Sequence, residues 1–200
     1  MRYIGDNAFY NCHNIKNVHI NNLSAWCRIY FEHAYGNPLC YAENLYLNGD
    51  KITELVIPNN ITEINQYAFC NYIGTTNVIF HENISKIGEG AFAGCKNVTS
   101  IYSYIPADKL FILGDLAFEN INKSKCILYV PNGAKEKYSI TEGWKEFKEI
   151  VEISDTTGIN AVTLYLEKNE VYNLKGQRIT ENENLTRGIY IVNGRKVLIK

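Results

Sequence analysis

Residues 78–95 have the sequence VIFHENISKIGEGAFAGC, in which a short apolar run precedes the phrase Ile-Gly-x-x-Ala-Phe. The run alternates β-branched and aromatic residues, which predicts a short β-strand. In the phrase that follows, Ala91 is small enough for a close approach between neighbouring segments, and Phe92 is large enough to fill a core. We expect this phrase to form a short helical turn. One such strand-and-turn unit cannot bury its apolar face alone.

Both parts of this segment recur along the chain. The copies of the Ala-Phe phrase lie at 4–9, 64–69, 87–92 and 113–118. Their alanines are Ala8, Ala68, Ala91 and Ala117, so the intervals are 60, 23 and 26 residues. Strand-like runs follow the phrases or lie between them, at 15–20, 52–58, 77–80, 98–102 and 127–131. A period near 23 lies in the range of leucine-rich repeats, whose units stack to bury a continuous core.

The repeated segment also resembles a known family. Residues 78–95 are similar to the BspA-like leucine-rich repeats of Bacteroidetes surface proteins and their treponemal relatives, and residues 55–64, LVIPNNITEI, are the same strand-then-coil unit. The resemblance covers residues 3–150. It implies a leucine-rich-repeat solenoid, β-rich with short helical turns, of the right-handed β/α superhelix type. It also implies a cell-surface or secreted protein, because the family is described as cell-surface and some members bind host extracellular proteins.

The pattern predicts two domains. Residues 1–152 form the solenoid, which residues 132–150 close with a more charged final repeat. Within it we expect an insertion at about 21–50, where the regular pattern is replaced by Trp26, Cys27, Tyr41 and Tyr46. Near its end, an alternating run over 45–47 is followed by Asn48-Gly49, which predicts a strand entering a hairpin.

Residues 153–200 form a different module. Strand-like runs lie at 163–166, 171–174, 177–179, 188–192 and 195–199. Asn193-Gly194 joins the last two, a strong signal for a β-hairpin, so we predict a small antiparallel β module. Its GIYIVNGRKV sequence at 188–197 resembles the C-terminal β modules of secreted Bacteroidetes proteins. This resemblance implies a sorting signal for export, and a structural cap on the solenoid is the equal alternative.

Charge and composition narrow the possible functions. With 20 basic and 21 acidic residues the formal net charge is −1, so the chain lacks the basic footprint of a nucleic-acid binder. A hydrophobic fraction of 46% is too high for a disordered chain. No apolar run reaches the roughly 18 residues of a membrane span, and residues 1–20 lack a signal-peptide pattern. The abundant asparagines predict many turns, because Asn tolerates left-handed backbone.

The cysteines and histidines do not form a pattern that predicts a catalytic or metal-binding site. The six cysteines are Cys12, Cys27, Cys40, Cys70, Cys95 and Cys126. Cys12 and Cys95 occupy equivalent repeat positions, which favours reduced core residues; a disulfide between Cys27 and Cys40 is the alternative to check. The four histidines lack zinc-ligand spacing, and no nucleophile, phosphate-loop or dinucleotide motif occurs. We therefore expect no catalytic residue, no metal and no cofactor.

One row of side chains is the candidate interaction surface. If the strands are aligned on 55–57, the residue between two inward-facing residues points outward. The outward row is His19, Val56, Ile79, Tyr102 and Tyr129. Exposed apolar stripes rimmed by polar groups often mark binding sites, and tyrosine is favoured in binding hot spots. The alternative is that the C-terminal module or the insertion covers this row.

These observations predict a non-enzymatic module of the cell surface or the secreted space. Its role is adhesion or interaction, with an extracellular host or community protein, or a glycan, as the partner. Two other functions stay open. The repeats would serve as a spacer or stalk of a larger surface protein, or as an accessory segment of a larger enzyme, which a start inside a repeat would permit. The sequence predicts no oligomeric state.

Overall fold

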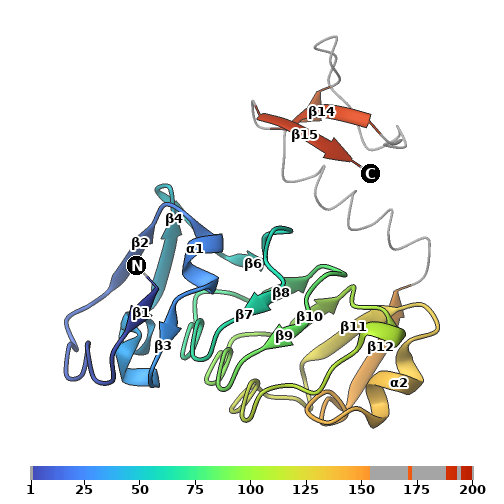
Figure 1. The fold of residues 1–200 in the computed structure, drawn as a ribbon, viewed down its shortest axis with the longest axis horizontal. Coiled ribbons are helices and arrows are strands. Elements are labelled where there is room, and N and C mark those ends of the chain that lie inside the picture. Colours follow the sequence, from blue (N-terminus) through green and yellow to red (C-terminus); the bar gives the residue numbers. More distant parts are fainter. Residues whose placement is uncertain (1, 154–170, 173–187, 193–194, 200) are drawn as a thin grey trace. The chain divides into compact units, whose positions relative to one another are not determined.

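The computed structural model describes residues 2–153, 171–172, 188–192 and 195–199, which belong to two compact units, Met1–Glu152 and Ile153–Lys200 (Figure 1). In the first unit the chain winds through successive turns of a solenoid, here called coils, coloured from blue to orange in Figure 1. Its strands are β1 (Tyr3–Ile4), β2 (Asn17–Ile20), β3 (Tyr30–Phe31), β4 (Asn44–Leu47), β5 (Asp50–Lys51), β6 (Glu54–Val56), β7 (Glu63–Ile64), β8 (Asn77–Phe80), β9 (Lys86–Ile87), β10 (Ser100–Ser103), β11 (Ile127–Pro131) and β12 (Glu149–Ile153). The described helices are α1 (Leu23–Cys27), α2 (Lys135–Ile140) and the 3-10 helices η1 (Ala34–Gly36), η2 (Pro38–Cys40) and η3 (Ala107–Lys109).

Parallel ladders connect the coils. The longer strands form a five-stranded sheet in the order β12-β11-β10-β8-β6, and a separate parallel pair, β2 and β4. Short strands form the second kind of ladder, in the pairs β1-β3 and β7-β9. In four coils a short strand precedes a long one: β1 and β2 in the first coil, β3 and β4 in the second, β7 and β8 in the third, β9 and β10 in the fourth. This arrangement confirms the predicted leucine-rich-repeat solenoid.

The predicted inward face of the long strands is buried. The central residues Leu55, Val78, Ile101 and Leu128 are each 0% exposed. Equivalent residues stack because the strands are parallel and in register, for example Ile101 opposite Leu128. Alternation with a period of two therefore identified the core side of β6, β8, β10 and β11 correctly.

Residues 21–50, where we expected an insertion, contribute a coil of their own. Tyr30 pairs with Tyr3 in the short ladder, and Asn44 pairs with Asn17 in the long ladder. The repeat motif is lost here because Tyr35-Gly36 stands where the other coils have Ala-Phe. Backbone ladder bonds do not depend on side-chain identity, so the coil survives this change. Its core is filled instead by Trp26, Phe31 and Leu39, all of which are buried.

A hairpin follows the second coil and interrupts the long ladder. β5 pairs antiparallel with β4, with Leu47 opposite Asp50. Asn48 and Gly49 have φ values of 54° and 96°, as a type I′ turn requires. The predicted hairpin at Asn48-Gly49 is therefore confirmed. Because β5 occupies the free edge of β4, β6 pairs with β8 and begins the five-stranded sheet.

The Ala-Phe phrases differ from the short helical turns expected for them. Two residues in the left-handed region flank each Ala-Phe pair, one directly before the Ala and one two positions after the Phe. In the fourth coil these are Gly90 (φ 55°) and Gly94 (φ 75°), and elsewhere they are Asn7, Asn11, Tyr67, Asn71, Leu116 and Asn120. A right-handed helix excludes positive φ, so the chain forms consecutive hydrogen-bonded turns, such as Ala91 N–H to the Gly88 carbonyl at 3.2 Å. Four of the eight positions are asparagine, which confirms the expected use of this residue.

Leu116 occupies one of these left-handed positions at a cost that a mutation can relieve. Its side chain is 58% exposed, and its φ is 56°. A residue with a branched apolar side chain is strained in this conformation by about 1–2 kcal/mol, whereas Asn adopts it more readily. We expect Leu116→Asn to raise the free energy of unfolding by about 0.5–1 kcal/mol in urea titrations. The control is Ile112→Asn, also on the surface, and equal effects of the two changes would contradict the prediction.

The Phe side chains of the phrases form the centre of the core. Phe69 and Phe92 stack with ring centroids 5.4 Å apart, and Phe92 and Phe118 stack at 5.5 Å. The glycine of the phrase allows the coils to approach this closely. A Cβ atom on Gly88 would lie 2.6 Å from the backbone nitrogen of Gln66 in the preceding coil.

Residues 132–150 close the repeats. They contain α2 and lead into β12, the terminal strand of the five-stranded sheet. Tyr138 and Trp144 are both 0% exposed, and their rings meet edge to face at 5.2 Å. The Tyr138 hydroxyl is also within 2.6 Å of the Ser103 hydroxyl, a buried polar residue of β10. The side chains of this segment thus cover the last coil of the core.

In the second unit the structure describes β13 (Val171–Tyr172), β14 (Gly188–Val192) and β15 (Arg195–Ile199). They form an antiparallel sheet in the order β13-β14-β15, with Val192 opposite Arg195. The predicted strands at 163–166 and 177–179 and the turn residues Asn193-Gly194 lie outside the described residues.

Candidate interaction surface

Four residues of the outward row lie side by side on the five-stranded sheet. Val56 pairs with Ile79, Ile79 with Tyr102, and Tyr102 with Tyr129, on β6, β8, β10 and β11. Their sequence neighbours on the opposite face are buried, so the four side chains share the outer face of the sheet. Val56 is 49% exposed, and the other three are half-buried. The row is therefore a continuous apolar and aromatic strip.

The two tyrosines at its end form a stacked aromatic pair. The rings of Tyr102 and Tyr129 stack with centroids 4.5 Å apart and an angle of 7° between their planes. This spacing follows from the distance between neighbouring strands of a sheet. Burial, and next the neighbouring Tyr129, raise the pKa of Tyr102 above its ordinary value. The Tyr102 phenol therefore stays protonated at neutral pH and can donate a hydrogen bond.

His19 lies on the other long-strand sheet. It pairs with Tyr46 on β4, and the two rings stack at 4.5 Å. The hairpin separates this pair from Val56, so the outward row has two segments rather than one. Tyr46 was missing from the predicted row, although the alternation of 45–47 gave a signal for it. Beside His19 is a surface hollow of about 620 Å³ that includes Trp26 and Ile29 in its lining.

Polar side chains flank the row. The Asn77 side-chain amide donates to the Glu54 carboxylate at 3.3 Å, and on the other sheet Asn44 donates to the Asn17 side chain at 2.9 Å. These residues lie two positions before the row on their strands and so share its face. An apolar strip with a hydrogen-bonding rim is typical of binding surfaces.

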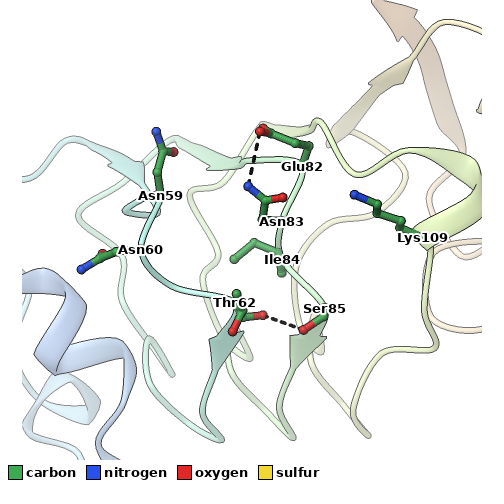
Figure 2. A pocket seen from close by; sticks show the side chains of 8 residues that line it. All are labelled: Asn59, Asn60, Thr62, Glu82, Asn83, Ile84, Ser85 and Lys109. Carbon is green, nitrogen blue, oxygen red and sulfur yellow. Dashed lines mark hydrogen bonds between the residues drawn. The ribbon is translucent and has the colours of Figure 1, made fainter. Parts of the chain in front are cut away.

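A second, polar hollow of about 690 Å³ lies at the turns that follow β6 and β8 (Figure 2). Its lining is Asn59, Asn60, Thr62, Glu82, Asn83, Ile84, Ser85 and Lys109. The Ser85 hydroxyl donates to the Thr62 carbonyl at 3.1 Å, and Lys109 of η3 points toward these residues in Figure 2. The sequence did not single out this hollow, because its side chains are ordinary turn residues that only the stacking of coils brings together.

The cysteines agree with the favoured prediction of reduced residues rather than with the alternative of a Cys27–Cys40 disulfide. All six cysteines are free in the structure. Cys27 is 0% exposed inside the core, and the Cys40 sulfur lies 2.7 Å from the Ala34 carbonyl and 3.5 Å from the Asn71 side-chain amide. Within the part of the chain that the structure describes, no group of three or more His, Cys, Asp or Glu side chains is placed to hold a metal ion. None of the described helices has the length and hydropathy needed to cross a bilayer.

The comparisons with known proteins agree with this architecture. A family model for the BspA type leucine rich repeat region matches residues 1–34 and 42–163, in 6 copies, which is more than half of the chain. Such repeats are non-catalytic and generally serve protein interaction. The unmatched residues 35–41 are those in which η1 and η2 replace the Ala-Phe turn. No curated protein matches the chain.

Proposed function

The chain belongs to the family of BspA-type leucine-rich-repeat proteins, and on this basis we propose that it is an interaction module that acts at the cell surface or after secretion. Its outward row binds an extracellular protein or a glycan and contributes to adhesion. A solenoid suits this role because it offers a large regular surface for its length.

The stacked pair of Tyr102 and Tyr129 is the observation that supports this proposal most directly. The two parallel rings stack with centroids 4.5 Å apart and form an aromatic pair, and Ile79 extends the apolar strip along the sheet. The outer edges of the stacked rings suit contact with apolar groups of a sugar or of a protein side chain, and their hydroxyl groups can make hydrogen bonds. The carboxylate of Glu54 and the amide of Asn77 lie at the rim of this strip, where they can exchange hydrogen bonds with hydroxyl or amide groups of the partner.

Binding to an array of extracellular-matrix proteins, plasma proteins and glycans tests the proposal. We expect saturable binding by the whole chain to at least one member of the array. The double change Tyr102→Ser and Tyr129→Ser is expected to weaken that binding at least tenfold, about 1.4 kcal/mol, because it removes both rings of the aromatic pair. Surface plasmon resonance measures the affinity, and circular dichroism verifies that the variant is folded.

The chain offers a matched control. Tyr3 and Tyr30 also stack, at 5.9 Å, but they lie on the short ladder of β1 and β3. Tyr3→Ser with Tyr30→Ser should leave the affinity within about twofold of the wild type, since these rings lie outside the outward row. Equal losses in the two double variants would contradict a site on the outward row. Absence of saturable binding to every member of the array would favour the spacer or the accessory-segment function.

A further inference from the structure

Exposed aromatic rings gather on the turns that follow the short strands β1, β3 and β7. Tyr10 and Tyr35 are 54% and 42% exposed, and their rings meet edge to face with centroids 5.4 Å apart. The ring of His33 lies 5.6 Å from that of Tyr35 and 5.6 Å from that of Tyr67. Tyr10, His33, Tyr35 and Tyr67 thus form one group that spans the first three coils, here called the turn cluster.

The turn cluster is separate from the outward row. The outward row lies on the long strands, whereas the turn cluster lies on two Ala-Phe turns and on the equivalent turn of the second coil. Backbone hydrogen bonds join these turns to their neighbours: Phe9 N–H donates to the Tyr35 carbonyl at 3.0 Å, and Tyr67 N–H donates to the Glu89 carbonyl at 2.9 Å. The spacing of the rings is therefore set before a partner arrives, which lowers the entropic cost of binding.

The repeat itself does not require these tyrosines. Tyr35 stands where the other coils have the alanine of the Ala-Phe phrase. Tyr10 follows the phenylalanine of its phrase, and the later phrases have Cys70, Ala93 and Glu119 at this position. The turn therefore forms without an aromatic ring at either position. Exposed tyrosines that cluster in this way are typical of binding surfaces, because tyrosine offers a large contact area at a small loss of side-chain entropy.

Carboxylates lie beside the rings of the turn cluster. The Asp6 carboxylate is 3.9 Å from Nδ1 of His33, and the Tyr67 hydroxyl donates a hydrogen bond to the Glu89 carboxylate. Asp6 and Glu89 are both exposed. An incoming group that covers the rings therefore also meets two negative charges.

The negative charge continues along all of the equivalent turns. The segments 5–12, 32–41, 65–71, 88–94 and 114–120 contain no lysine and no arginine. Their acidic residues, all exposed, are Asp6, Glu32, Glu89, Asp115 and Glu119. The whole chain is nearly balanced, with 20 basic and 21 acidic residues, so these turns are a local concentration of negative charge. Such a surface attracts a cationic partner and repels an acidic one.

We propose that the turn cluster binds a lysine- or arginine-containing segment of a second protein. A guanidinium or ammonium group lies against the tyrosine rings in a cation–π contact, within reach of the carboxylates of Asp6 and Glu89. Arginine is the preferred residue, because its planar group stacks on aromatic rings and donates two parallel hydrogen bonds to a carboxylate. A neutral glycan fits less well, since it would cover these carboxylates without a charge to pair with them. Binding at the turn cluster does not depend on the function proposed for the outward row.

Fluorescence polarisation with the whole chain tests the proposal. The probes are three fluorescein-labelled peptides of equal length, in which glycine alternates with arginine, lysine or glutamate. We expect saturable binding of the arginine peptide, weaker binding of the lysine peptide and no binding of the glutamate peptide. Added salt should weaken the binding of the arginine peptide, because mobile ions screen exposed charges. No saturable binding of the arginine peptide, or equal binding of the glutamate peptide, would overturn the proposal.

Two double variants locate the site. Tyr10→Ser with Tyr35→Ser removes the two most exposed rings of the turn cluster and is expected to weaken binding of the arginine peptide about tenfold. Asp6→Asn with Glu89→Gln removes two charges and preserves side-chain size, and it is expected to weaken binding about threefold to tenfold. Circular dichroism verifies that each variant is folded. An unchanged affinity in the folded tyrosine variant would contradict the assignment of the rings to the site.

A matched control separates a local site from attraction to net charge. Glu43→Gln with Asp50→Asn removes the same charge from two exposed carboxylates that lie outside the turns. Its affinity for the arginine peptide should stay within about twofold of the wild type. Equal losses in the two charge variants would overturn the proposal, because they would show attraction to net charge alone. This comparison decides the question even if the tyrosine variant fails to fold.

Discussion

Replacing Phe92 with alanine is expected to lower the free energy of unfolding of the repeat unit by about 3–5 kcal/mol. Phe92 is 0% exposed and lies between two other phenylalanines, Phe69 at 5.4 Å and Phe118 at 5.5 Å. A fourth ring, Phe80, meets it edge to face at 5.4 Å. The change removes the central ring of this group, so it loses both buried apolar area and several aromatic contacts.

The cavity left by Phe92→Ala has little freedom to collapse. The Phe92 N–H donates to the Ala117 carbonyl at 2.8 Å, and Phe69 N–H donates to the Ala91 carbonyl at 2.8 Å. These bonds fix the spacing of the three coils, so the flanking rings cannot close the space. Urea unfolding followed by far-ultraviolet circular dichroism measures the loss. The control Ile112→Ala removes an apolar side chain that is 70% exposed and should cost less than about 0.5 kcal/mol. A similar small cost for Phe92→Ala would show that the coils do not share one core.

Trp144→Ala is expected to have an effect of similar size, about 4–5 kcal/mol, at the other end of the repeats. The indole is 0% exposed and contacts Tyr138 at 5.2 Å and Phe118 at 5.7 Å. Its N–H also donates to the Phe111 carbonyl at 3.0 Å, a bond that alanine cannot make. The expected loss therefore combines a large cavity with one unsatisfied hydrogen-bond acceptor.

The location of Trp144 predicts which part of the repeat unit unfolds locally in the Trp144→Ala variant. In a repeat protein each unit depends on its neighbours, so loss of the closing segment exposes the adjacent coil. Amide hydrogen exchange should accelerate most in β11 and β12 and least in β2 and β4. The control Trp144→Phe keeps an aromatic ring and should lose only about 1–2 kcal/mol. Uniform acceleration along the whole repeat unit would contradict this prediction, because it would mean that the coils unfold as one block.

The regular coils could be predicted from the sequence because their signals are local. Alternation in strands such as 77–80 fixes which side chains face the core, and recurrence of the Ala-Phe phrase fixes the order of the coils. The same alternation placed Val56, Ile79, Tyr102 and Tyr129 on one face. His19 was assigned to the same face, but the hairpin of β4 and β5 separates it from the other four residues. Its neighbour Tyr46 was missed, since the alignment assumed one unbroken sheet.

The second coil shows why the rest could not be predicted in this way. Tyr35-Gly36 in place of Ala-Phe removes the motif, while the backbone hydrogen bonds that define the coil remain. The Ala-Phe turns were also not predictable from residue type. Their left-handed positions hold Asn, Gly, Tyr or Leu, so no single residue type marks these positions in the sequence. A motif search detects side chains that repeat, whereas the fold requires only that the backbone geometry repeats.

The sequence by itself determined the repeat architecture, the buried face of the long strands and the outward position of Tyr102 and Tyr129, because each depends on periodic order within a short segment. Only the tertiary structure decided that 21–50 forms a coil and that the long-strand sheet is interrupted before β6. These features depend on which distant segments stack on one another. Stacking is set by packing and ladder hydrogen bonds across the coils, which no single segment contains.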